Sequence, residues 1–232
     1  MYISRFELNK KLRETHRLLQ SAERIHAAVL GCFPSNTQQI LWRIDDIDSS
    51  KFLIVVSPIR PDFKHMQEKY GWNNGQSAGR TVNYMPFLSK LKTGDKFRFK
   101  LDANPVFKFS GKNVSESVKH PRKKGKVYGM QSIEEHNNWL ISKASKNGFL
   151  VEKRAVSNTG EVEDRVTFIV RKKGKLRFYK SNNEKRQLVT IAIATYEGIL
   201  EITDVDMFRK ALTTGIGRAK AYGQGMLTIA KI

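Results

Sequence analysis

The order in which strand-like and helix-like patterns follow one another constrains the fold of this chain most. Residues Tyr2–Leu8 alternate between two sides, as a β-strand does. An apolar helical stripe follows, made of Leu18, Ala22, Ile25, Val29 and Cys32. Two strands joined by a polar turn, a helix and a last strand are then predicted at Ile40–Ile44, Phe52–Val56, Asp62–Tyr70 and Lys96–Leu101. This β-α-β-β-α-β order over residues 1–103 predicts a ferredoxin-like (RRM-like) unit.

The second half of the chain shows a similar alternation after a basic segment at residues 104–130, which we interpret as a linker or hairpin. Ser132 and Glu135 form a capping box that opens a helix, and Gly148 ends it. Further strands and a helix are predicted at Phe149–Val156, Val166–Val170, Leu188–Ile202, Asp204–Leu212 and Met226–Ala230. If a short strand also lies between Pro105 and Met130, residues 131–232 complete a second such unit. The sequence thus predicts an α+β fold of two tandem ferredoxin-like (RRM-like) βαββαβ domains, the second with an inserted basic hairpin.

A glycine-rich segment, G-I-G-R-A-K-A-Y-G-Q-G, precedes the last predicted strand. Glycine admits positive φ and a close approach of the backbone to a ligand, and successive amides in such a loop can bind an anion. A dinucleotide-binding loop follows a strand and opens a helix, whereas this one follows a helix and precedes a strand, which excludes a nicotinamide or flavin site. The alternatives are a tight turn or a phosphate-binding loop made of Gly215, Gly217, Arg218, Lys220, Gly223 and Gly225.

The charge balance indicates a polyanionic partner. The chain has 42 Lys and Arg against 22 Asp and Glu, a formal net charge of +20, and such a surplus repels itself unless an anion neutralises it. Nucleic acid is the leading partner and an anionic membrane surface the second. No segment approaches the ~20 apolar residues of a membrane span, the opening residues lack a signal-peptide core, and Cys32 is the only cysteine. We therefore expect a soluble, cytoplasmic protein without disulfides.

Two runs of basic residues could contact the backbone of a nucleic acid. The first contributes Lys119, Arg122, Lys123 and Lys124. The second contributes Arg171, Lys172, Lys173, Lys175 and Arg177, and its central Gly174 suggests a β-hairpin tip bearing cations. A charge run is usually only a solvated face, but two runs in so basic a chain favour nucleic acid. A tip of this kind suits an RNA duplex, which is recognised largely by shape and backbone.

His26 is the candidate for chemistry, because it lies about 100° round the predicted helix from Ile25, at the edge of the apolar stripe. A histidine there is commonly an ordinary boundary residue. It would suit RNA strand scission, in which the ribose 2′-OH attacks the adjacent phosphate and imidazole moves the proton without a metal. Asp45 is interpreted as a turn residue, and the other histidines, His136 among them, as surface residues without metal-ligand spacing. We predict no cofactor and no metal.

Several segments of this chain, in order and over nearly its whole length, resemble the CasE family, the CRISPR repeat-processing endoribonucleases of type I-E Cascade. They include M-Y-I-S-R-F-E-L, R-I-H-A-A-V-L-G-C-F-P, L-W-R-I-D, F-L-I-V-V-S-P, G-D-K-F-R-F-K-L-D-A-N-P-V-F-K, A-T-Y-E-G-I-L-E-I-T-D and G-I-G-R-A-K-A-Y-G-Q-G-M-L-T-I. The A-N-P element and the terminal glycine loop are the specific parts.

The resemblance implies a metal-independent, single-turnover nuclease that cuts precursor CRISPR RNA at the base of each repeat stem-loop. It implies 5′-OH and 2′,3′-cyclic phosphate ends, and a product hairpin held as a Cascade subunit. The expected partners are the stem-loop, the other Cascade proteins, particularly the backbone subunit at the 3′ end of the CRISPR RNA, and target DNA only through the complex. His26 matches the family's catalytic histidine, and Arg98, Lys100 and Lys108 flank the A-N-P element as further RNA-binding candidates.

One position departs from the family pattern. Some members have a tyrosine three residues before the histidine, where this chain has Glu23. Glu23 could orient His26, or Tyr2 could assist instead. Two readings without cleavage also stay open: a module of the same fold that holds a processed RNA hairpin, and a scaffold protein whose charge serves assembly only.

Overall fold

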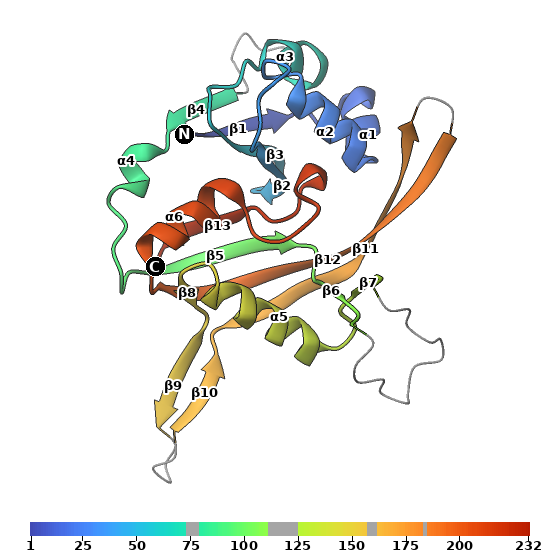
Figure 1. Cartoon of the computed structure of the whole chain (residues 1–232). Helices are drawn as coiled ribbons and strands as arrows, with labels where there is room; N and C mark the ends of the chain where they lie inside the picture. Colours follow the sequence, from blue (N-terminus) through green and yellow to red (C-terminus); the bar gives the residue numbers. More distant parts are fainter. Residues whose placement is uncertain (73–78, 111–124, 157–161, 183–184) are drawn as a thin grey trace.

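The computed structural model describes residues 1–72, 79–110, 125–156, 162–182 and 185–232. Two antiparallel sheets lie one above the other in Figure 1, each with helices beside it. No helix in the described part of the chain is long and apolar enough to cross a membrane. The helices and antiparallel sheets together confirm the α+β class predicted from the sequence.

The first sheet has the strand order β2-β3-β1-β4. Its strands are β1 (Tyr2–Leu8), β2 (Leu41–Ile47), β3 (Ser50–Ser57) and β4 (Gly79–Asn83). Strands β2 and β3 join through Asp48 and Ser49, both with positive φ, so the turn is shorter than the polar segment suggested. Asp45 is consequently a buried strand residue, and its interpretation as a turn residue is wrong.

Three helices cover one face of the first sheet: α1 (Arg13–Leu19), α2 (Ala22–Leu30) and α3 (Lys64–Tyr70). The predicted apolar stripe is buried throughout, but it is divided between two helices, and its last member, Cys32, lies just beyond the end of α2. Ser21 has an extended backbone (φ −143°, ψ 120°), which ends α1 and starts α2. The stripe survives this break because both helices lie on the same core.

The second sheet has the strand order β11-β12-β5-β13. If the four main strands of each sheet are numbered along the chain, both sheets have the order second, third, first, fourth. Its strands are β5 (Lys96–Ala103), β11 (Phe168–Asn182), β12 (Lys185–Ile202) and β13 (Leu227–Lys231), and its helices are α5 (Ile133–Ser145) and α6 (Val205–Thr214). The predicted capping box of α5 is present. The remaining short elements are α4 (Met85–Leu88), β6 (Val106–Lys108), β7 (Val127–Gly129), β8 (Phe149–Leu150), β9 (Glu152–Val156), β10 (Val162–Val166) and the 3-10 helix η1 (Lys220–Tyr222).

Three strand predictions differ from the structure. Strand β5 does not close the first unit: it pairs with β12 and β13, and β4 takes the fourth place in the first sheet. The expected strand Phe149–Val156 is divided, because β8 pairs with β12 while β9 pairs with β10. The basic run Arg171–Lys180 is not a hairpin tip, since it lies within β11 and pairs along β12. Alternation identifies a strand but not the strand beside it.

A buried ionic cluster joins the two sheets. Arg43 on β2 is only 3% exposed, and its guanidinium donates to both carboxylate oxygens of Asp45, at 2.9 and 2.7 Å. It also donates to Thr228 Oγ1 at 2.8 Å and to the carbonyl of Met226 at 3.1 Å, both in the second sheet's last strand region. Lys100 on β5 donates to Asp45 Oδ1 at 2.7 Å. These contacts fix the position of the first sheet on the second.

Candidate nucleic-acid site

His26 lies where three elements meet. Helix α2, which carries it, contacts both η1 and strand β11. Ile25, one residue earlier, is in the core, and His26 is half-buried at its edge, as the helical wheel predicted. Strand β11 reaches this point because its Phe178 packs into the first core. The site therefore lies between the two halves of the molecule.

The electrostatic surroundings favour a neutral imidazole at His26. Burial lowers its pKa below 6.5, the charge of Glu23 raises it and the charge of Lys180 lowers it further, with burial the largest effect. The Nδ1 atom is buried and has no hydrogen-bond partner within the residues that the structure describes. A neutral imidazole can accept a proton near neutral pH, which general-base chemistry requires.

Tyr222 is the aromatic side chain beside His26. The two ring centroids are 6.3 Å apart at an interplanar angle of 60°. Tyr222 also meets Phe178 of β11, with ring centroids 4.6 Å apart. Tyr2, suggested as an assistant, lies on β1 opposite Ser57 and Asn83, and its role stays a prediction. Glu23 acts on the pKa of His26 but has no other assigned role.

The glycine loop positions Tyr222. All four predicted glycines, Gly215, Gly217, Gly223 and Gly225, have positive φ. At Gly223 (φ 76°) a Cβ would come within 2.8 Å of the Trp42 ring, so both the conformation and the close approach require glycine. The neck of the loop is closed by hydrogen bonds from the Ile216 amide to the Gly225 carbonyl, at 2.7 Å, and from the Gly225 amide to the Asp102 carbonyl, at 2.6 Å.

The two cations of the glycine loop have different surroundings. Arg218 is exposed, whereas Lys220 is partly buried and burial lowers its pKa. Several amides of the loop are used to hold its shape, so a phosphate cradle would have to come from the segment around Arg218. Whether the loop binds phosphate stays a prediction.

The basic run on β11 divides between two faces of the strand. Successive side chains of a strand point to opposite sides. Lys172 and Leu176 line a cavity with Tyr222, and Phe178 and Lys180 follow on that same face. The predicted residues Lys173, Lys175 and Arg177 belong to the opposite face and are exposed. Only part of the run can therefore act near His26.

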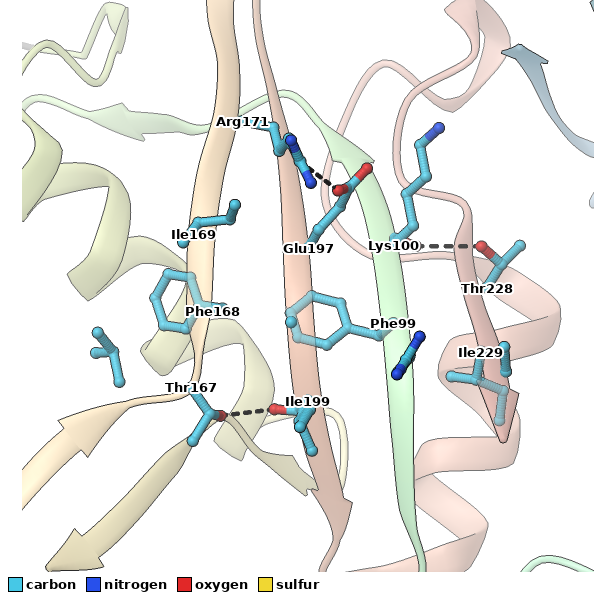
Figure 2. A pocket seen from close by; sticks show the side chains of 14 residues that line it. Phe99, Lys100, Thr167, Phe168, Ile169, Arg171, Glu197, Ile199, Thr228 and Ile229 are labelled. Carbon is cyan, nitrogen blue, oxygen red and sulfur yellow. Dashed lines mark hydrogen bonds and ion pairs between the residues drawn. The ribbon is translucent and has the colours of Figure 1, made fainter. Parts of the chain in front are cut away.

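Other predicted cations lie on the face of the second sheet that Figure 2 shows from close by, the face whose Lys100 contacts the first sheet. Arg98 is exposed there and lines a groove of about 700 Å³ together with Arg171. Arg171 is paired with Glu197, with Nε and Oε2 2.7 Å apart. Lys100, which lines the same groove, is paired with Asp45 in the cluster between the sheets. Lys100 therefore has a structural role that its sequence position did not reveal.

The last predicted cations lie elsewhere. Lys108 is exposed on β6, which Figure 1 shows far from α2. Asn104 of the A-N-P element donates to the carbonyl of Ala192 at 2.6 Å, which ties this element to β12. Four predicted residues lie outside the described part of the chain: Lys119, Arg122, Lys123 and Lys124.

Sequence reasoning missed several residues of the site. Tyr222, Trp42, Gln224 and Lys180 come together only through the meeting of α2, β2, β11 and the glycine loop. An aromatic residue within a glycine-rich loop was the one available signal. His136, expected at the surface, is 2% exposed and its Nδ1 lies 3.0 Å from the Tyr196 hydroxyl. Within the described residues, no three His, Cys, Asp or Glu side chains converge as metal ligands.

Comparison with known proteins places this chain in a family. A family model described as "CRISPR associated protein" matches residues 1–231. The CRISPR-associated endoribonuclease Cse3 of Thermus thermophilus is 25% identical over 237 residues, which cover 99% of this chain and 100% of that protein.

Two groups of solved structures share the fold. A CRISPR endoribonuclease Cse3 bound to a 19-nucleotide RNA matches with a TM-score of 0.74 and 21% identity, covering 99% of this chain and 100% of that one. A chain of a pre-nicking CRISPR RNA-guided surveillance complex matches with a TM-score of 0.62 and 22% identity, covering 100% of both. Because the family model spans almost the entire chain, the chain belongs to this CRISPR-associated protein family, and the resemblance to its CasE (Cse3) members is confirmed.

Proposed function

We propose that this protein is an endoribonuclease that cuts precursor CRISPR RNA at the base of the repeat stem-loop. The observation that carries the proposal is the position of His26, between the glycine loop and the cationic strand β11. Family membership supports it, as does the similar protein named an endoribonuclease. A similar structure holding RNA supports an RNA substrate.

The reaction needs no more than proton transfer and charge stabilisation. The 2′-oxygen forms a bond to phosphorus while the bond to the leaving 5′-oxygen breaks, which gives a 2′,3′-cyclic phosphate and a 5′-OH. Neutral His26 would take the 2′-OH proton, and solvent water would supply the proton that the leaving 5′-oxygen needs. Lys180, whose charge reaches His26, and Lys172, on the same face of β11, would stabilise the negative charge of the transition state. This route uses no metal.

The RNA stem would be held by shape and backbone charge. A-form RNA has a major groove too narrow to be read by side chains, so duplex contacts go mostly to phosphates and 2′-hydroxyls. Exposed cations lie on the face of β11 opposite Lys172, and Lys175 and Arg177 are among them. They suit phosphates along one side of a stem. The product hairpin would then stay bound, as expected of a Cascade subunit. The similarity to a surveillance-complex chain supports this assembly.

The two sheets support a finer description of the fold. Each is built from a β-α-β-β-α-β series in which the second, third, first and fourth strands are neighbours in that order. We assign both to the ferredoxin-like (RRM-like) type and place the division between Asn83 and Lys96, because β5 belongs to the second sheet. The hairpins β6–β7 and β9–β10 are then insertions in the second unit.

A second candidate function is a subunit that holds the RNA hairpin without cutting it. It is favoured by the lack of a hydrogen-bond partner for His26 Nδ1 in the described part of the chain, since catalytic imidazoles are usually oriented by one. The fold and the basic surface serve either function equally.

Single-turnover cleavage in EDTA separates the two functions. An end-labelled precursor with one repeat hairpin is incubated with excess wild type, His26→Ala, or His16→Ala as the matched control, because His16 is exposed on α1. We expect one cut with a cyclic phosphate end for wild type and His16→Ala, and binding without cutting for His26→Ala. Tight binding by all three proteins without any cut would support the second function, and equal cutting by all three would remove His26 from the active site.

A further inference from the structure

A small cavity next to His26 has no role in the proposed cleavage. It has a volume of about 200 Å³ and lies between α2, β2, β11, β12 and the glycine loop. Ile25, the neighbour of His26, forms part of its wall, and so does Tyr222. The volume exceeds the space of one water, about 30 Å³, and is smaller than a drug-sized pocket of about 300–1,000 Å³. A volume of this size suits a ligand no larger than a single ring system.

Two polar atoms among the residues that line this cavity lack partners. Trp42 is 4% exposed and Gln224 is 9% exposed. The Trp42 Nε1 donor and the Gln224 Oε1 acceptor are both buried without a hydrogen-bond partner in the residues that the structure describes. Leaving a buried donor or acceptor unpaired costs about 1–3 kcal/mol, so such groups normally have a partner. Both side chains belong to the wall of one small cavity, so turning them inward would offer a ligand one donor and one acceptor.

The walls of the cavity are held in place. The backbone at Gly223 lies directly against the Trp42 ring, and Tyr222 is held against Phe178 with ring centroids 4.6 Å apart. Arg43 and Asp102, which also line the cavity, are engaged in the cluster between the sheets. Lys172 is exposed and could meet a phosphate outside the cavity while a ring enters it.

We propose that this cavity binds one unpaired nucleobase, from a nucleotide next to the bond that His26 cuts. The inference deepens the proposed function and rests on it. Nucleobases are planar, fit the cavity's size and carry both donors and acceptors, which match Trp42 Nε1 and Gln224 Oε1. Tyr222 offers an aromatic face, and its contact with His26 links the bound base to the reacting phosphate. Binding a splayed base here would align the adjacent ribose for in-line attack.

The test combines protein variants with RNA that lacks single bases. Hairpin RNAs carry an abasic ribose at each position within about three nucleotides of the cut, and equilibrium binding is measured for wild type and Gln224→Leu. Gln187→Leu is the control, because Gln187 is exposed on β12. At one position we expect the abasic RNA to bind wild type about 10-fold more weakly, as for the loss of one stacked base. At that position Gln224→Leu should cost nothing further, while it weakens binding of the intact RNA.

The proposal is overturned if the penalties for Gln224→Leu and for the missing base multiply at every position. It is also overturned if no abasic position weakens binding to wild type. If Gln224→Leu fails to fold, wild type with 2-aminopurine at the same positions gives a second reading. We expect its fluorescence to be quenched at one position on binding, and no quenching at any position contradicts the pocket. Because binding and fluorescence do not require cutting, they are separable from cleavage. Coupling without a cut would refute the nuclease and keep the pocket, whereas a cut without coupling would refute the pocket alone.

Discussion

The two sheets share one strand order, but their corresponding hairpins, β2–β3 and β11–β12, have opposite roles. In the first sheet, β2 and β3 close through Asp48 and Ser49, and Arg43 is buried in the contact with the second sheet. In the second sheet, the corresponding strands β11 and β12 form a long arm, visible in Figure 1, that exposes its cations. The same topology therefore serves internal cohesion in one half and a candidate RNA surface in the other.

The groups of the candidate site also come from both halves of the molecule. The first half provides His26 on α2, while the second provides Tyr222 and the basic face of β11. Neither half holds a complete set of these groups. The contact between the sheets, rather than either sheet alone, therefore defines the candidate site.

The largest effect should come from Arg43→Met, which removes the link between the sheets. It would leave Asp45, 7% exposed, with a buried charge that only Lys100 offsets. Breaking one partner of a buried ion pair costs about 3–5 kcal/mol. The control is Lys96→Met, whose pair with Glu201 is 3.3 Å long and lies at 52% and 45% exposure. We expect at most about 1 kcal/mol there, measured by urea unfolding. Similar small losses for both variants would mean that the sheets are held together otherwise.

Next in size is Gly223→Ala, which tests whether the loop's shape positions Tyr222. Positive φ (76°) and the approach of a Cβ to within 2.8 Å of Trp42 predict a loss of stability of about 1–3 kcal/mol, together with slower cleavage. Gly174→Ala on β11 is the control, because a Cβ there meets nothing within 4 Å. That change should leave cleavage unaltered and stabilise the strand by about 0.5–1 kcal/mol. Equal effects of the two alanines on cleavage would sink the role given to the loop.

A smaller effect is expected from charge removal on the two equivalent hairpins. Lys175→Gln on β11 should weaken binding of the repeat hairpin and reduce the slope of log affinity against log salt by about 0.7–0.9 per lost phosphate contact. Lys51→Gln on β3 should change neither, since Lys51 pairs with Asp46 within the first sheet. The measurement is hairpin binding over a range of salt concentrations. A matching loss of slope for Lys51→Gln would erase the contrast between the hairpins.

The smallest effects concern the titration of His26, followed by NMR of its imidazole. Because burial lowers its pKa below 6.5, the unfolded chain binds more protons between the two pKa values. The stability due to this group is therefore complete above 6.5 and is lost as the pH falls. Glu23→Gln should lower the pKa further and Lys180→Gln should raise it, since their charges act in opposite directions. Shifts of the same sign would contradict the placement of His26 between the two halves.

Much of the fold could be predicted, because local periodicity reports which side of an element is buried. The alternation of β1, the apolar stripe of α1 and α2 and the capping box of α5 are all present in the structure. The glycines of the loop have the positive φ that their number suggested. His26 lies at the edge of the core, where its angular distance from Ile25 placed it.

The partners of these elements were decided by tertiary structure alone. Strand β5 alternates equally well for either sheet, and only packing assigned it to the second. Lys100 was expected to bind RNA, but contact between the sheets pairs it with Asp45, and the same contact buries Arg43. Tyr222 reaches His26 across almost the whole length of the chain. Periodicity encodes the face that a residue presents, whereas the group that meets this face depends on contacts distant in sequence.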